Sequence, residues 1–434
     1  MKFWKTHQES ILNILVFTLV LGWVSNSVAA KSNHRNILFE DLPVLVNEKN
    51  EKISAAKLNI KAQDERTGIL GRSFLPQVSV AVGQEQFKSD IDPALSQEYW
   101  KLETSINIYK GGRDSVEDKL QNAVLDLTKT EADRVSQNEL KMAKQEFWKI
   151  VSLNQLILDR KEALQKNELN LKSAKKRAGA GIVTTADGAQ FELHQISIER
   201  EITNLKLEKE KALNRLKVIL SIEESESIDI DGDFPKQIEQ GFDANQPSSD
   251  QHTEVKIQKN LEQVELLKTD YSARWWLPKV DLYSNYGLPS LTENYDHAQS
   301  KSKEWNAGVR MIFDLGQGFE DRQESIAKKM EAEAMGKKVN YAIRNGQALE
   351  KELRYELSIL RELIKATEQD TKTAQNFLKL TESEYMRGVK NGPDLLEAVQ
   401  KYFTFRDRRI DYNLKFFTAK SELESLSVAI ESKK

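Results

Sequence analysis

Two stretches of the chain, residues 113–177 and 319–387, contain no proline. A helix rises ~1.5 Å per residue, so either stretch would form a helix on the order of 100 Å long, which no compact domain can hold. The 434 residues include only 8 prolines and 19 glycines, and 30% of them are charged. This composition is typical of long, uninterrupted helices. We therefore predict an elongated molecule built largely from helices.

Apolar residues recur every seven positions along the helical segments, which predicts coiled-coil packing. One such lane in the first long helix consists of Ala143, Ile150, Ile157, Leu164 and Leu171. A second lane, in the segment that follows, consists of Phe191, Ile198, Leu205, Ala212 and Ile219. Adding 207 to these numbers gives the apolar or aromatic residues Ala398, Phe405, Tyr412, Ala419 and Leu426. An offset that preserves a whole lane predicts an internal duplication.

Short segments of alternating polarity lie before each long helix. Two of them follow a Leu-Pro pair, at Leu75-Pro76 and Leu277-Pro278. Proline lacks an amide proton and disfavours helix in the preceding residue, so each pair predicts a junction from helix to strand. The predicted strands are 77–87, 100–110, 279–288 and 305–315.

The second strand of each pair begins with a tryptophan, Trp100 or Trp305, on its apolar side. An apolar face with an aromatic end and a polar opposite face suit a transmembrane barrel wall, in which the aromatics form an interfacial girdle. The alternative is a half-buried soluble hairpin.

Two glycine-containing turns separate the long helices from the helices that return. Gly181 and Gly388 each precede an aspartate, Asp187 or Asp394, by six residues. Glycine closing one helix and aspartate in the first turn of the next could serve helix capping alone. The predicted turns are 178–186 and 388–393, with return helices over 187–219 and 394–430.

The first thirty residues differ from the rest of the chain. Lys2 and Lys5 precede an apolar run at 11–24, and small residues follow, as in a secretory signal peptide cleaved after Ala29 or Ala30. The alternative is a membrane anchor, for which the run is short. The chain has no cysteine, so we expect its stability to come from packing and assembly rather than from disulfides.

Several classes of function are disfavoured. A net charge of -3 without a long basic tract gives no electrostatic footprint for nucleic acid. The five histidines are scattered, and a thiol nucleophile is excluded. We predict no enzyme activity, no cofactor and no metal.

The order of these parts resembles the TolC-like outer-membrane efflux proteins, across nearly the whole mature chain. Arg177, Gly181 and Asp187 match that family's helix-tip motif, and Gly388 and Asp394 match it in the second half. Glu384 stands where the second arginine would be. The resemblance implies two structural repeats, 31–222 and 253–434, joined by an acidic linker at 223–252.

The fold class implied is an internally duplicated α+β membrane protein. Each chain would contribute four transmembrane strands to a trimeric 12-strand barrel, continuous with a long periplasmic α-helical coiled-coil barrel. Four strands alone cannot close, and unpaired edges are not tolerated in lipid.

The function implied is a passive exit duct in the outer membrane of a Gram-negative bacterium, with a large periplasmic portion. The implied partners are two further copies of the chain, a periplasmic adaptor protein, an inner-membrane transporter and outer-membrane lipid. Drugs, metals and type I secreted proteins stay open as cargo. The alternative is a soluble periplasmic coiled-coil scaffold.

The resemblance also implies roles for particular residues. An aperture gate would be formed by Asp394 and Glu397, with a latch of Asp187, Tyr385 and Lys390. Lysine at position 390 replaces the family's arginine and offers a point charge instead of a planar fork. The tips that contact the adaptor would be Ala180, Gly181, Ile182, Arg387, Gly388 and Val389. Ordinary acidity at a helix start is the alternative for the gate pair.

Overall fold

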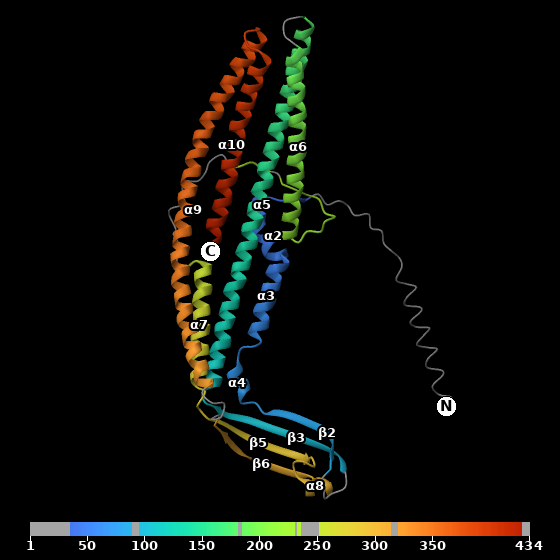
Figure 1. Cartoon of the computed structure of the whole chain (residues 1–434), viewed down its shortest axis with the longest axis vertical. Helices are drawn as coiled ribbons and strands as arrows, with labels where there is room; N and C mark the ends of the chain where they lie inside the picture. Colours follow the sequence, from blue (N-terminus) through green and yellow to red (C-terminus); the bar gives the residue numbers. More distant parts are fainter. Residues whose placement is uncertain are drawn as a thin grey trace, which may run out of the picture.

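The computed structural model describes residues 35–88, 95–180, 185–230, 232–235, 251–313 and 320–427. The predicted signal peptide lies outside these residues, as do Gly181, Ile182 and most of the predicted linker. The molecule is elongated, with a four-stranded sheet at one end and two helical hairpins that reach the other (Figure 1).

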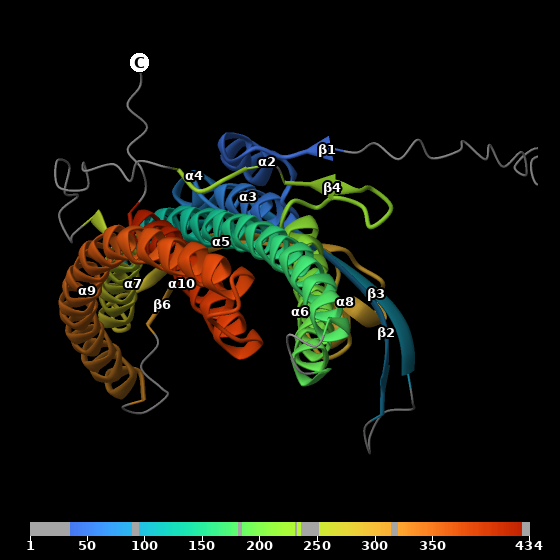
Figure 2. The same cartoon turned by 90° about the horizontal axis from the view of Figure 1, so that it is seen from above.

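Four long helices form the two hairpins. Helix α5 (Arg113–Gly179) packs along α6 (Thr185–Ile219), and α9 (Glu320–Met386) packs along α10 (Gly392–Ser425). Helices α5 and α9 have 67 residues each, as the proline-free stretches predict. Helix α10 also packs against α5, and α7 (Thr253–Ala273) packs between α5 and α9. Seen from above, these helices form a curved wall (Figure 2).

The segment before the first strand is divided into short pieces. These are the 3-10 turn η1 (Phe39–Asp41) and the helices α2 (Leu42–Lys49), α3 (Glu51–Asp64) and α4 (Ile69–Ser73). Asn50 caps α3 by accepting the amide of Ile53, and Gly68 before α4 has φ 70°. The corresponding segment of the second half is the single helix α7, so the two halves differ here.

The main sheet is antiparallel, with the order β2-β3-β5-β6. Its strands are β2 (Gln77–Phe87), β3 (Leu95–Lys110), β5 (Lys279–Leu288) and β6 (Glu304–Ile312). Strands β2 and β5 cover the residues expected from the alternation. Strand β3 begins five residues earlier than expected, because it pairs with β2 as far as Phe87 and Leu95. A small parallel pair joins β1 (Arg35–Asn36) to β4 (Ile228–Asp229).

One face of the main sheet is apolar and exposed. The register places Val80, Leu102, Tyr286 and Trp305 in one row across the four strands. Their neighbours on the same face include the exposed residues Val78, Val82, Val309 and Met311. Serine, lysine, glutamate and asparagine side chains alternate with them on the opposite face.

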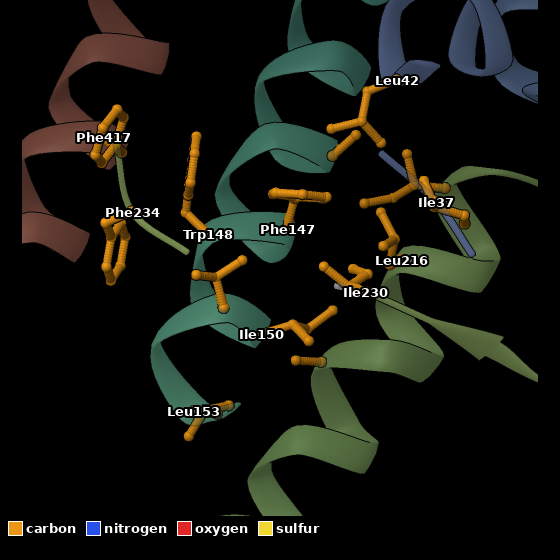
Figure 3. Packing of buried hydrophobic residues seen from close by; sticks show 14 of the residues in the cluster. Ile37, Leu42, Phe147, Trp148, Ile150, Leu153, Leu216, Ile230, Phe234 and Phe417 are labelled. Atoms are coloured by element: carbon orange, nitrogen blue, oxygen red, sulfur yellow. The ribbon is translucent and has the colours of Figure 1, made fainter. Parts of the chain in front are cut away.

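The core lies between the helices, midway along the molecule. Trp148 of α5 stacks on Phe417 of α10, with ring centroids 4.2 Å apart, and on Phe234, 5.6 Å away (Figure 3). A second buried cluster lies nearer the tips and includes Phe191, Tyr385 and Leu395. The heptad-lane residues are buried in these two clusters or packed against them, except Ile157, which is buried outside both. Among the helices in the described ranges, none is long and apolar enough to cross a membrane.

Candidate functional site

The second helix tip is built by local capping. Gly388, with φ 82°, lies in the turn after α9, and Asn391 caps α10. The Asn391 side chain accepts a 3.0 Å hydrogen bond from the backbone amide of Asp394, and the Asp394 carboxylate accepts a 3.3 Å hydrogen bond from the backbone amide of Asn391. This reciprocal pair satisfies two amides that a helix start leaves without intrahelical partners.

Arg177, at the end of α5, connects the first tip to the second. Its guanidinium donates a 2.7 Å hydrogen bond to the carbonyl oxygen of Tyr385 on α9. The same group lies 4.6 Å from the centre of the Tyr385 ring, which is within cation–π range. Arg177 is therefore the polar contact that joins the two hairpins at their ends.

Tyr385 lies at the centre of this arrangement and is only 1% exposed. Its ring packs edge-on against Phe191 of α6, with centroids 6.4 Å apart. Burial raises the pKa of the Tyr385 phenol, Arg177 opposes this shift and Asp187 adds to it. The tyrosine is therefore held neutral in a packed junction between α5, α6 and α9.

Asp187 faces the start of α10. A Cβ added at the buried Gly392 would lie 3.2 Å from the Asp187 carboxyl carbon. The absence of a side chain at Gly392 thus allows α6 and α10 to approach closely at the tips.

Lys390 is not part of this junction. It is exposed, and its side chain forms no hydrogen bond or ion pair with the described residues. The structure therefore brings Asp187 and Tyr385 together but leaves Lys390 outside. The sequence motif contained Arg177 but did not show that its partner is Tyr385.

The predicted gate residues lie on the first two turns of α10. Asp394 is occupied in the capping pair, as the helix-start alternative requires. Glu397 is exposed and forms a 2.6 Å ion pair with Lys401, one turn further along. Within one chain, the capping role accounts for the placement of Asp394.

The remaining predicted residues lie at the two ends of the molecule. Ala180, Arg387, Gly388 and Val389 are exposed at the tips. At the predicted helix-to-strand junctions, Leu75 and Pro76 are exposed, whereas Leu277 and Pro278 are partly buried. Of the two predicted girdle residues, Trp100 is partly buried and Trp305 is 75% exposed.

Arg113, at the start of α5, ties the second junction to the long helix. Its guanidinium donates hydrogen bonds of 2.9 Å and 2.7 Å to the carbonyls of Arg274 and Trp275. In the part of the chain that the structure describes, no three acidic or histidine side chains are grouped to hold a metal.

These features define a class of protein with long paired helices, closely packed tips and a short antiparallel sheet that exposes one apolar face. Residues 254–427 match the family described as outer membrane efflux protein. No curated protein sequence matches the chain.

Solved structures share the fold over most of the chain. The outer-membrane channel OprN has 12% identity and a TM-score of 0.76, and the match covers 89% of each chain. The Campylobacter jejuni CmeC outer membrane channel has 15% identity and a TM-score of 0.74, covering 89% of this chain and 85% of that one. The open state of the Neisseria gonorrhoeae MtrE outer membrane channel has 13% identity and a TM-score of 0.71, covering 89% and 88%. The predicted resemblance is confirmed: residues 254–427 match the outer membrane efflux protein family, and the chain shares its fold with solved outer-membrane channels.

Replacement of Arg177 by methionine tests the junction between the tips. The hydrogen bond and the cation–π contact should together contribute roughly 1–2 kcal/mol. If these contacts hold the tips of a channel closed, as proposed below, the fraction of time the purified protein conducts in planar bilayers should rise about tenfold. Arg200→Met, at an exposed position of α6, is the control and should leave the conducting fraction unchanged.

Proposed function

We propose that the chain is an outer-membrane channel of a Gram-negative bacterium that acts as a passive exit duct. The observation that carries this proposal is the sheet, whose exposed apolar face lies at the end of helices long enough to extend far from a membrane. The family match and the shared fold support it.

The proposed assembly is a trimer with a shared 12-strand barrel. The strands at the two sides of the sheet, β2 and β6, each have one edge without a partner among the described residues. Such edges are not tolerated in lipid, and pooling four strands from each of several copies removes them. The matching lanes at an offset of 207 support an internal duplication, in which each copy contributes two equivalent hairpins.

The proposed partners are a periplasmic adaptor and an inner-membrane transporter, which supply the energy for transport. The exposed tip residues Ala180, Arg387, Gly388 and Val389, together with residues 181 and 182, would contact the adaptor. Asp187 and Tyr385 would hold the aperture closed, and Trp100 and Trp305 would lie at the membrane interface.

Membrane fractionation tests the proposed location and assembly. The protein should be recovered with outer membranes, as a trimer that dissociates on heating, and should conduct ions in planar bilayers. A soluble monomer would instead support a periplasmic coiled-coil scaffold. Deleting the gene and comparing drug susceptibility, metal tolerance and secreted proteins would assign the cargo.

The proposed gate predicts an effect of neutralising Asp394 and Glu397. Around three chains these carboxylates would form two acidic rings, which attract cations at the narrowest point. The double variant Asp394→Asn, Glu397→Gln keeps the side-chain shapes, and it should weaken block by polyvalent cations and lower cation selectivity in bilayers. Glu333→Gln, at an exposed position on α9, should change neither quantity. Unchanged block in the double variant would leave Asp394 with capping alone.

A further inference from the structure

The loop between β5 and β6, residues 289–303, packs against the end of the β2–β3 hairpin, which extends past the end of β5. Its short helix α8 (Tyr295–Gln299) contacts β3, which is not one of the two strands that the loop connects. Leu291 and Ala298 are buried, with exposed fractions of 4% and 0%. The loop is therefore packed against the sheet.

Four contacts fix this position, and all of them reach β2 or β3. They are the 2.8 Å hydrogen bond from the Thr292 hydroxyl to Glu85, the 2.8 Å ion pair of Glu293 with Lys101, the hydrogen bond from the Gln97 amide to the Ala298 carbonyl, and the ring contact of Tyr295 with Phe87 at 5.6 Å. The loop thus reaches from β5 to the end of β2, the strand at the other edge of the sheet.

The base of the loop is fixed separately, to β6. The Nδ1 atom of His297 lies 2.9 Å from the Glu304 carboxylate, and the Asn294 amide donates to the same carboxylate at 3.0 Å. The loop is therefore a strap attached at β6, with its middle held against β2 and β3.

The strap covers the polar face of the sheet. Glu85 pairs with Gln97 in the register, and Lys101 lies four residues from Gln97, so these three side chains share one face. Val82 and Trp100 are paired on the opposite, apolar face. In Figure 2, α8 lies on the inner side of the curved strands β2 and β3.

We propose that residues 289–303 form a second constriction of the duct, at the end of the sheet far from the helices. This inference rests on the proposed function, since the polar face lines the channel only if the apolar face contacts lipid. Each of three copies would place one strap inside the barrel, so the channel is narrowed at both ends.

The contacts that hold the strap are suited to release. The ion pair of Glu293 with Lys101 is partly open to water, with side-chain exposures of 47% and 23%, and Glu85 is half-buried. Ion pairs that water can reach contribute little to stability. The strap can leave the polar face without exposing a large apolar surface, because its buried apolar side chains are those of Pro289, Leu291 and Ala298, of which only leucine is large. Passage of cargo would displace it toward the wall or the exterior.

Thiol labelling tests the position of the strap, since the natural chain has no cysteine. In the purified full-length Gln299→Cys variant, whose exposed position on α8 is not among the contacts that hold the strap, a charged methanethiosulfonate reagent should reduce the single-channel conductance in discrete steps, one for each copy. The matched control is Val82→Cys, which is exposed on the apolar face and should give no such steps. Labelled Gln299→Cys with unchanged conductance would overturn the proposal.

Release of the strap gives the second measurement. Thr292→Val removes the hydrogen bond from the hydroxyl to Glu85 without altering charge, and only the 3.3 Å hydrogen bond from the Thr292 amide to Glu85 is left. Glu293→Gln removes the ion pair with Lys101. The combined variant should show a higher conductance and should admit larger neutral polymers than the natural protein. Lys301→Gln, an exposed position on the same loop, is the control. If the combined variant forms channels with the conductance and polymer cut-off of the natural protein, the proposed constriction is contradicted. If the natural protein forms no channels, the proposed function itself is contradicted.

Discussion

Replacement of Arg406 by methionine is expected to lower the melting temperature of the purified protein strongly at pH 8 and weakly at pH 5. Arg406 of α10 forms a 2.6 Å ion pair with Glu162 and a second ion pair with Asp159, both on α5. In the reverse direction, Arg160 of α5 binds Asp407 of α10 at 2.6 Å. These reciprocal arginines join the two hairpins midway between the core and the tips.

The large effect at pH 8 follows from the burial of Asp159, which is 4% exposed. A buried charge that loses its partner is strongly destabilising, and breaking such a pair costs about 3 kcal/mol or more. Arg406 retains some exposure and Glu162 is more exposed still, so we expect the lower end of that range.

The pH dependence follows from the pKa of Asp159. Burial raises this pKa from 3.8 to about 6, and Arg406 opposes the shift. The folded protein therefore binds more protons than the unfolded chain between these values, and the stability contributed by this group is lost as pH rises through about 6. Without Arg406 the pKa of Asp159 rises further, because the charge that opposes the shift is gone. The variant therefore goes on losing stability at higher pH, and the difference in melting temperature between the variant and the natural protein widens above pH 6.

Two variants isolate the effect of Asp159. Arg406→Met combined with Asp159→Asn should show little pH dependence in its destabilisation, because the buried group can no longer ionise. Arg409→Met, which removes a more exposed ion pair with Glu368 on α9, should lower the melting temperature only slightly at either pH. An equal effect of Arg406→Met at pH 5 and pH 8 would contradict this account of Asp159.

Trp148→Ala should destabilise the protein by about 3–5 kcal/mol, through the lost apolar contact and the cavity left behind. Trp148 is 5% exposed, and its ring packs against Phe417 of α10 at 4.2 Å and against Phe39 of η1 at 4.9 Å. The side chain thus connects three segments that are far apart in the sequence.

Thermal unfolding followed by circular dichroism would measure this loss. Leu158→Ala, on the same helix but 62% exposed, provides a control that should change the melting temperature little. A small effect of Trp148→Ala would mean that the aromatic cluster can close around the missing ring. Because thermal unfolding of a large protein can be irreversible, the variants should be compared at one heating rate.

The element boundaries were predictable where the residues themselves determine them. Strands β2 and β5 follow a proline and alternate with period two, and both begin and end at the expected residues. The extra length of β3 could not be predicted, because its first residues alternate weakly and are in the strand only through pairing with β2. The breaks between α2, α3 and α4 occur at Asn50 and Gly68. In the sequence, a single asparagine or glycine within a helical segment can equally lie on the surface of a continuous helix, so these breaks could not be predicted.

The tip junction was only partly predictable. The turn motif located Arg177 and Asp187, but the partner of Arg177 is a backbone carbonyl more than 200 residues away. Backbone atoms carry no sequence signal, so this contact depends on how the two hairpins pack. The ion pairs that Arg160 and Arg406 form between α5 and α10 could not be predicted for a related reason. In the sequence, these arginines look like the charged residues of an ordinary solvent-exposed helix face.

The alternating directions of the four strands have a consequence for biogenesis. Strands β2 and β6 run in opposite directions, so the last strand of one copy can pair antiparallel with the first strand of the next. A single copy that entered the bilayer alone would leave two rows of amides and carbonyls unpaired in hydrocarbon. In the proposed shared barrel, insertion into the membrane and oligomerisation would therefore be coupled, because a subunit that inserted alone would leave both edges without partners.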